Sequence, residues 1–193
     1  MLPRIGSSKL VSTWILVTLG ASIFSMLGAG WLASWAALEP SEIWHGQLWR
    51  LVTWALVEAG PYGLAITIVS IYKFGGELAP RWGDRRLRSF MLQLVIAAGV
   101  VTALGALVSD RAWHMSRCGG MAVGDALCIA WARQYPTAQI RVYGLLTLSG
   151  KQLIVATAGF TILMAVAYGP FAMAPELVCC LGAACYPRAW LSR

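Results

Sequence analysis

Long uncharged runs alternate with short polar segments along this chain. Three runs, at residues 10–38, 89–109 and 152–175, contain no charged residue. An apolar stretch of about 18 residues or more is long enough to cross a bilayer as a helix. Shorter apolar segments with the same potential lie at residues 59–72, 118–132 and 172–186. The pattern predicts an all-α, polytopic membrane protein with six transmembrane helices.

The first run raises the alternative of a signal peptide. The apolar core of a signal peptide is about 7–15 residues long and ends at a small-residue cleavage site. Because the run at residues 10–38 is far longer, we interpret it as a retained span. The predicted organisation is a cytoplasmic N-terminal tail over residues 1–9 and a six-helix transmembrane domain over residues 10–191.

Composition and charge agree with this interpretation. The chain is 59% hydrophobic and 12% charged, whereas soluble domains have about 25% charged residues. The net charge of +7 would suit nucleic acid, but the positions of the charges argue against that partner. With a cytoplasmic N-terminus, all of the fifteen Lys and Arg residues lie inside except Arg50, Arg111 and Arg117. This asymmetry follows the positive-inside rule and predicts two cytoplasmic termini, with membrane lipids as partners.

The first outer loop, at about residues 39–60, is unusually rich in tryptophan. Trp44, Trp49 and Trp54 are interleaved with Arg50 and apolar residues. Tryptophan favours the membrane interface, and backbone within the bilayer must be hydrogen-bonded in helices or buried in protein. We expect a membrane-embedded loop whose four residues are candidate contacts for lipid or partner proteins. Simple anchoring at the interface is an equal alternative.

Small residues recur at intervals of four in two of the shorter segments. Gly120 and Gly124 lie in the fourth segment, and Cys179 and Ala183 lie in the sixth. Small residues four apart let membrane helices approach closely, so we expect tight packing of both and a central fourth helix. The five cysteines do not have the spacing of a zinc site. The sequence predicts no disulfide, no metal and no cofactor.

Four stretches resemble motifs of the rhomboid and derlin superfamily, in the order and spacing of that superfamily. Residues 46–53 (Gly-Gln-Leu-Trp-Arg-Leu-Val-Thr) resemble its Trp-Arg loop motif, and residues 74–83 resemble the end of its second helix. Residues 177–188 resemble the tail of its sixth helix. The loop before the fifth helix of many bacterial rhomboids is matched at Pro136, Ile140, Gly144 and Lys151.

This resemblance covers nearly the whole chain and implies a six-helix rhomboid-like bundle. The catalytic positions depart from the family pattern. Active rhomboids have a serine nucleophile at the start of the fourth helix and a histidine base in the sixth, where this chain has Ala122 and Glu176. A nucleophile needs a base within hydrogen-bond reach. The resemblance therefore implies a pseudoprotease, which is not an enzyme and has no catalytic residues.

Asp125 and Glu176 form a candidate intramembrane polar site. The resemblance places them on the two helices that build the family's active site. A carboxylate at the bilayer centre costs about 2.5–3.5 kcal/mol on insertion scales, so it usually faces the bundle interior or water. Two neighbouring carboxyls would share a proton, as in aspartic proteases. An intramembrane protease with this atypical pair is one alternative, and a proton or solute path is another. Structural carboxyls, or a contact with a partner helix, are the simpler interpretation.

The leading hypothesis from the sequence is a non-catalytic rhomboid-like membrane protein. It would act as an adaptor, a client-binding protein or an accessory subunit of a larger membrane complex. Because the six spans leave no room for a soluble domain, we expect its partners to be other transmembrane proteins and lipids. Compactness and short loops favour a bacterial plasma membrane.

Overall fold

The computed structural model describes residues 8–142 and 146–187, and these residues are almost entirely helical. The helices are α1 (Lys9–Met26), α2 (Gly30–Ala36), α3 (Pro40–Trp44), α4 (Arg50–Thr53), α5 (Pro61–Ser70), α6 (Gly76–Trp82), α7 (Asp84–Gly105), α8 (Asp110–Trp113), α9 (Met121–Gln134), α10 (Gly150–Tyr168) and α11 (Ala174–Cys185). Short turns η1 (Trp54–Leu56), η2 (Ile71–Gly75) and η3 (Ala106–Val108) extend α4, α5 and α7. The antiparallel strands β1 (Gln139–Val142) and β2 (Leu146–Ser149) join α9 to α10.

Each predicted apolar segment contains a helix, and the all-α polytopic class is confirmed. Within the described residues, α1, α7 with η3, and α10 are long and apolar enough to cross a membrane. A fourth span results if Arg50–Leu56 and Pro61–Trp82, which meet at a 95° bend, count as one. The helices α9 and α11 have only 14 and 12 residues. At about 1.5 Å per residue, both are shorter than the hydrocarbon core of about 30 Å, so the count of six spans stays a prediction.

The first predicted span, residues 10–38, extends too far. α1 ends at Met26, and Gly28 follows with a φ of 127°, a backbone conformation that favours glycine. The chain then turns into the separate helix α2. Residues 27–38 therefore belong to the outer region. The predicted tail over residues 1–9 lies mostly outside the described residues, and its last residue, Lys9, already begins α1.

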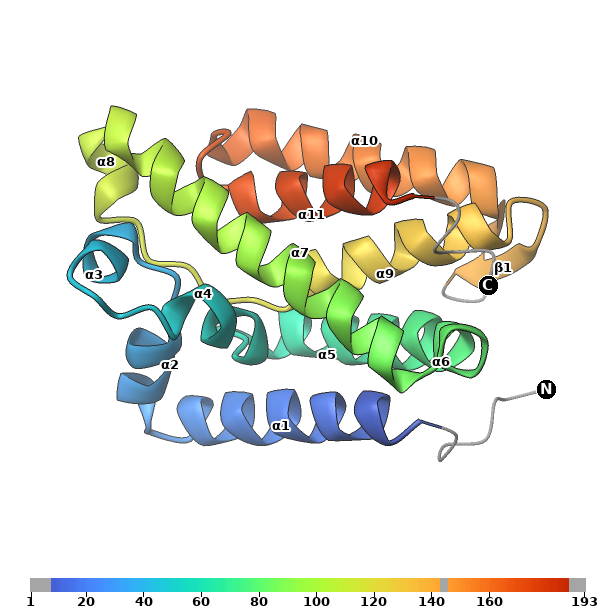
Figure 1. Cartoon of the computed structure of the whole chain (residues 1–193), viewed down its shortest axis with the longest axis horizontal. Helices are drawn as coiled ribbons and strands as arrows, with labels where there is room; N and C mark the ends of the chain where they lie inside the picture. The colour runs from blue at the N-terminus through green and yellow to red at the C-terminus, as the bar shows by residue number, and fades with distance from the viewer. Residues whose placement is uncertain (1–7, 143–145, 188–193) are drawn as a thin grey trace.

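Helix α9 lies at the centre of the bundle, as expected for the fourth segment. α7 crosses one face diagonally, with α1, α5 and α6 on one side and α10 and α11 on the other (Figure 1). α9 packs against α5, η2, α7, α10 and α11, and ten of its fourteen residues are buried. Such a helix has protein on most sides and little contact with lipid.

Gly120, at the N-cap of α9, and Gly124, within that helix, allow α5 to approach closely. A Cβ atom on Gly120 would lie 2.8 Å from Thr67 Cγ2, and one on Gly124 would lie 3.0 Å from Ser70 Cβ. Both distances are shorter than ordinary carbon–carbon contacts of about 3.5–4.0 Å. The glycine at each position therefore sets the spacing between the two helices.

Helix α11 is fixed to its neighbours by buried small residues and by hydrogen bonds from side chains. Cys179 and Ala183 are fully buried, and the Cys179 thiol donates to the carbonyl of Leu94 in α7 at 3.7 Å. Arg133 of α9 donates to the carbonyls of Ala183 and Tyr186 at 2.7 and 2.8 Å. The last carbonyl groups of a helix have no N–H partner within the helix, and at the end of α11 the Arg133 side chain supplies donors to them.

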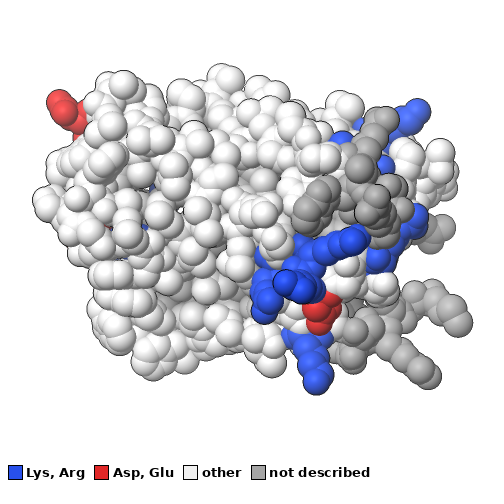
Figure 2. Space-filling model, viewed as in Figure 1, with Lys and Arg blue, Asp and Glu red and all other residues white. Residues whose placement is uncertain are grey.

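Glu77 and several basic residues lie at the end of the bundle where α6 meets α7 (Figure 2). Glu77 of α6 accepts a hydrogen bond from the Trp131 indole N–H at 2.6 Å and pairs with Lys73. On the face shown in Figure 2, Lys and Arg gather at the end where α1 begins and α6 meets α7, while the middle of the surface is uncharged. This distribution is the one expected from the positive-inside rule.

The junction between α9 and α10 has no room for a side chain at Gly150. A Cβ atom there would lie 2.4 Å from the carbonyl oxygen of Tyr135 and 2.9 Å from that of Ala132. The Gly150 N–H also donates to the Ala138 carbonyl at 3.0 Å. The start of α10 is therefore held directly against the backbone that follows α9.

We expect Gly150→Ala to lower the free energy of unfolding by about 1–3 kcal/mol. The added methyl group would overlap with backbone carbonyl oxygens, which cannot move aside as a flexible side chain can. Thermal or denaturant unfolding in detergent micelles measures the change. Gly159→Ala in the same helix is the matched control, since nothing lies within 4 Å of its added Cβ. An equal loss in both variants would contradict the packing argument.

Candidate functional site

The start of α9, where active rhomboids carry their serine, is closed and apolar. Ala122 is fully buried and Val123 is 2% exposed. Glu176 lies in the first turn of α11, which packs along α9. The structure thus places the two matching positions on neighbouring helices, but they carry a methyl group and a carboxyl in place of a hydroxyl and an imidazole.

A glutamate that the sequence analysis did not single out caps this helix. Glu58 lies between η1 and α5, and only 4% of it is exposed. Its Oε1 atom accepts hydrogen bonds from the Gly120 backbone N–H at 2.6 Å and from the Thr67 hydroxyl at 2.5 Å. The Met121 N–H adds a third bond to the carboxyl. The first N–H groups of a helix have no intrahelical partner, so Glu58 satisfies α9 from a distant part of the chain.

Glycines lie against the Glu58 carboxyl, and a serine of α1 accepts a hydrogen bond from the Glu58 backbone. A Cβ atom on Gly63 would lie 2.8 Å from Glu58 Oε2, and one on Gly119 would lie 3.3 Å from the same atom. The backbone N–H of Glu58 donates to Ser22 Oγ of α1 at 2.9 Å. Glu58 therefore joins three helices: its carboxyl accepts from α5 and from the start of α9, and its backbone N–H donates to α1.

Burial has the largest effect on the protonation of the Glu58 carboxyl. Burial raises the pKa of Glu58, and the hydrogen bonds from Thr67, Gly120 and Met121 oppose that shift because they favour the charged form. Burial, with a smaller effect of Glu58, also raises the pKa of the Cys118 thiol to about 11. That thiol stays protonated at neutral pH and is a poor nucleophile.

The amides at the start of α9 are therefore already occupied. Backbone N–H groups at a helix N-terminus form a ready anion site, and in acyl transfer such donors stabilise the developing oxyanion. Here the Glu58 carboxyl accepts from them. The carboxyl thus occupies the N–H groups of Gly120 and Met121 and links the outer loop to the bundle.

Asp125 and Glu176 lie on the facing helices α9 and α11, close enough to interact electrostatically. Within the described residues, Glu176 Oε2 is buried without a hydrogen-bond partner. Polar contacts continue along the seam with α10, where the paired atoms are Cys128 Sγ with Thr157 Oγ1 at 3.4 Å and Thr161 Oγ1 with Cys180 Sγ at 3.7 Å. The carboxyl pair is thus part of a polar seam inside the bundle.

Arg50 and Trp54 are buried residues that stabilise the outer loop. Arg50 is 6% exposed and Trp54 is 1% exposed. Arg50 Nη1 donates to the carbonyls of Ser34 and Ala37 at 2.7 and 2.8 Å, and its Nε donates to Gln47 Oε1 at 2.7 Å. The guanidinium serves as a structural cross-link of the loop, so neither residue is free to contact lipid or a partner.

Trp44 and Trp49 remain the exposed members of the predicted contact set. They are 51% and 41% exposed. The Trp44 indole N–H donates to the Ala103 carbonyl of α7 at 3.2 Å, and Trp49 stacks on Trp35 with ring centroids 5.4 Å apart. Their rings are fixed in orientation while one side of each stays available.

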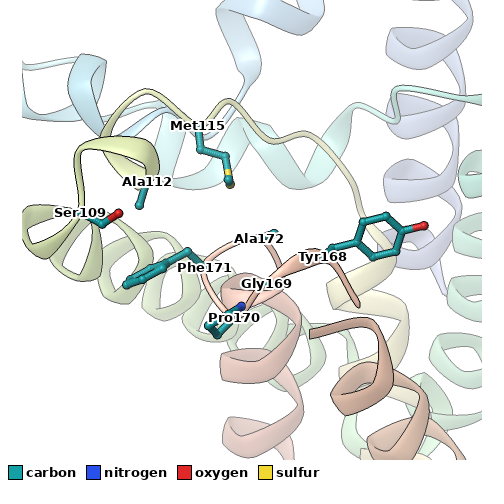
Figure 3. A pocket seen from close by; sticks show the side chains of 8 residues that line it. All are labelled: Ser109, Ala112, Met115, Tyr168, Gly169, Pro170, Phe171 and Ala172. Atoms are coloured by element: carbon teal, nitrogen blue, oxygen red, sulfur yellow. The ribbon is translucent and has the colours of Figure 1, made fainter. Parts of the chain in front are cut away.

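A separate pocket of about 210 Å³ opens at the outer end of the molecule, between α8 and the turn from α10 to α11. Met115 borders it from the segment between α8 and α9, and Phe171 borders it from the turn between α10 and α11 (Figure 3). Its lining carries no carboxyl, imidazole, amine or thiol group. No chemistry is assigned to it.

In the part of the chain that the structure describes, no three His, Cys, Asp or Glu side chains are placed to hold a metal ion, and the five cysteines are free. The fold and the site define a polytopic membrane protein with a helical bundle closed around a short central helix. The model of the family described as eukaryotic integral membrane protein (DUF1751) matches residues 9–189, and the chain belongs to this family.

The chain is also similar to Derlin-1 of Oryza sativa subsp. japonica, with 26% identity over 119 residues. The alignment covers 61% of this chain and 47% of Derlin-1, so the chain spans about half the length of that relative. These similarities confirm the resemblance to the rhomboid and derlin superfamily. The family's description as eukaryotic does not favour the bacterial plasma membrane expected from the short loops.

We expect Glu58→Ala to lower the free energy of unfolding by about 1–3 kcal/mol, because the N–H groups of Gly120 and Met121 and the Thr67 hydroxyl lose their acceptor while staying buried. Glu58→Gln keeps one acceptor oxygen and should lose less. Unfolding in detergent micelles measures both changes.

The matched control is Asp110→Asn, which removes an exposed acid of the outer region and should leave stability within about 0.5 kcal/mol of the wild type. Wild-type stability in Glu58→Ala would contradict the proposed role of the carboxyl. So would an equal loss in the control.

Proposed function

We propose that this protein is a non-catalytic, rhomboid-like membrane protein that binds the transmembrane segments of other proteins, as a client-binding protein or an accessory subunit of a complex. The proposal that the protein is non-catalytic rests on one observation. The Glu58 carboxyl accepts hydrogen bonds from Gly120 and Met121 at the start of α9, directly before Ala122 in place of a serine. Acylation of the protein would need a hydroxyl at that position and free donors beside it.

The binding part of the proposal rests on the polar seam. Glu176 Oε2 is buried without a partner in the described residues, and Asp125 lies on the facing helix. An ionisable group within a membrane usually pairs with another group or marks a functional path. Polar side chains across a membrane interface contribute about 0.6–2 kcal/mol to helix association. A partner helix with a basic or amide side chain would satisfy this pair.

The helix α10 offers such a partner a surface beside the seam. In α10 only Gly150, Leu153 and Thr161 are buried, so a partner helix could pack along its exposed side and approach the seam where α10 borders α9 and α11. The exposed rings of Trp44 and Trp49 provide a second contact at the outer surface. Membrane lipids and other transmembrane proteins are the proposed partners, and nucleic acid is not.

The proposed location is a eukaryotic membrane with the basic end of the bundle in the cytoplasm. The first residue of α1 and the last residue of α11 lie at that same end (Figure 1). The positive-inside rule places such an end on the cytoplasmic side. Both termini would then be cytoplasmic.

The experiment is gentle purification of the full chain from its native membrane, followed by quantitative mass spectrometry. The proposal predicts a defined transmembrane partner whose recovery falls severalfold in Asp125→Asn and Glu176→Gln, and which is retained in the control Asp110→Asn. A partner recovered equally in all four proteins would contradict binding through the carboxyl pair.

The Asp125–Glu176 interaction also favours a second candidate, an intramembrane acid protease. That candidate predicts cleavage of a co-purified or reconstituted transmembrane substrate, lost in Asp125→Asn and in Glu176→Gln. Cleavage with that pattern would overturn the non-catalytic proposal. Uncleaved, bound partner supports it.

A further inference from the structure

The inner ends of α1 and α7 face each other across a basic groove. Its volume is about 550 Å³, and it is lined by Lys9, Leu10, Thr13, Asp84, Arg85 and Arg88. Three lining residues come from the first two turns of α1 and three from the first two turns of α7. Away from this end, α1 packs mainly on α2, α5 and η2 and only marginally on α7. The groove is the space left between the two helix starts.

The single acid in the groove has a structural role. Asp84 accepts hydrogen bonds from the Ser8 hydroxyl at 2.8 Å and from the Leu10 backbone N–H at 3.3 Å. Ser8 in turn caps α1 by accepting from the Val11 N–H at 3.2 Å. Asp84 therefore ties the start of α1 to the start of α7 and fixes the distance between the two walls.

The three cations of the groove are exposed and unused. Lys9, Arg85 and Arg88 have no hydrogen bond or ion pair with any described residue. Three cations against the one carboxylate of Asp84 leave two positive charges in the groove. Figure 2 shows basic side chains at this end with an acidic group among them. Two arginines on one wall can each offer a bidentate fork to phosphate oxygens, and lysine adds a point charge.

The floor of the groove differs from its rim. Leu10 and Thr13 lie one turn apart on α1 and lead from the charged rim toward the span that crosses the bilayer. A ligand that fits both parts has a phosphate group at the level of the lipid headgroups and an apolar body that continues into the membrane. Basic pockets between transmembrane helices on the cytoplasmic side are typical sites for anionic lipid headgroups.

We propose that this groove binds an anionic phospholipid whose headgroup carries a phosphomonoester. The phosphomonoester supplies about two negative charges at neutral pH, which suits the excess of two positive charges that Lys9, Arg85 and Arg88 have over Asp84, and the phosphodiester of the same lipid adds one more negative charge. The glycerol and the upper acyl chain lie along Leu10 and Thr13. The inference is independent of partner binding at the polar seam, because the groove is at the inner end of α1 and α7.

The experiment measures binding of detergent-dissolved lipids to the full chain, purified in the same detergent. The probes are phosphatidylcholine, phosphatidylserine and phosphatidylinositol 4-phosphate. We expect the tightest binding to the phosphomonoester lipid. Removing one cation by Lys9→Gln or Arg88→Gln should weaken it by on the order of fivefold, and the double variant by more, since each basic residue contributes about equally at a charged surface.

The matched control is Lys151→Gln, which removes one exposed cation at the start of α10, on another side of the bundle. It should bind like the wild type. Equal weakening in Lys151→Gln and Lys9→Gln would show diffuse surface attraction and overturn the site. Unchanged binding in a folded double variant, checked by circular dichroism, would also overturn it.

Inositol phosphate and inorganic phosphate, added as competitors of the phosphomonoester lipid, distinguish a soluble ligand from a lipid. We expect each to compete only at concentrations at least a hundredfold above that of the lipid, because neither occupies the floor formed by Leu10 and Thr13. Competition at equal concentration would assign the groove to a soluble phosphate compound and overturn the lipid proposal.

Discussion

The fold depends most on one hydrogen-bonded carboxyl. Glu58 accepts from the first backbone N–H groups of α9 and from Thr67 of α5, and its own N–H bonds Ser22 of α1. Unpaired N–H groups at the start of a buried helix are costly inside a membrane, where water does not replace the missing partner. One loop residue thus satisfies the start of the central helix and ties it to α5 and, through its backbone N–H, to α1.

The same carboxyl explains how a rhomboid-like bundle can persist without rhomboid chemistry. The amides that would stabilise an oxyanion in acyl transfer still point out of the helix, but they now hold the outer loop. Arg50 serves the loop in the same way from its other end, through the carbonyls of Ser34 and Ala37. The region around the start of α9 is a structural joint, and one step further along the helices lie Asp125 and Glu176, whose Oε2 is buried without a hydrogen-bond partner among the described residues.

Much of the helical framework could be predicted because bilayer thickness imposes long apolar runs and because small residues at intervals of four mark close helix contacts. Other features depend on contacts between distant residues. Glu58 is separated from Gly120 by 62 positions. In its local sequence it is only an acid in a loop, so the neighbouring residues do not indicate that it caps α9. The break after Met26 depends on one glycine in an uncharged run, and the inner hairpin β1–β2 lay in a segment assigned to a loop. Arg50 and Trp54 matched the composition of an interfacial contact, yet tertiary packing buries both.

Hydrogen–deuterium exchange over residues 115–125 tests the central claim most directly, because it reports on the N–H groups of Gly120 and Met121 themselves. The wild-type protein in micelles should protect these amides as strongly as the middle of α9. In Glu58→Ala the same amides should exchange faster, while those in the middle of α10 stay as they are. Equal exchange of residues 115–125 in the two proteins would contradict a joint made by Glu58.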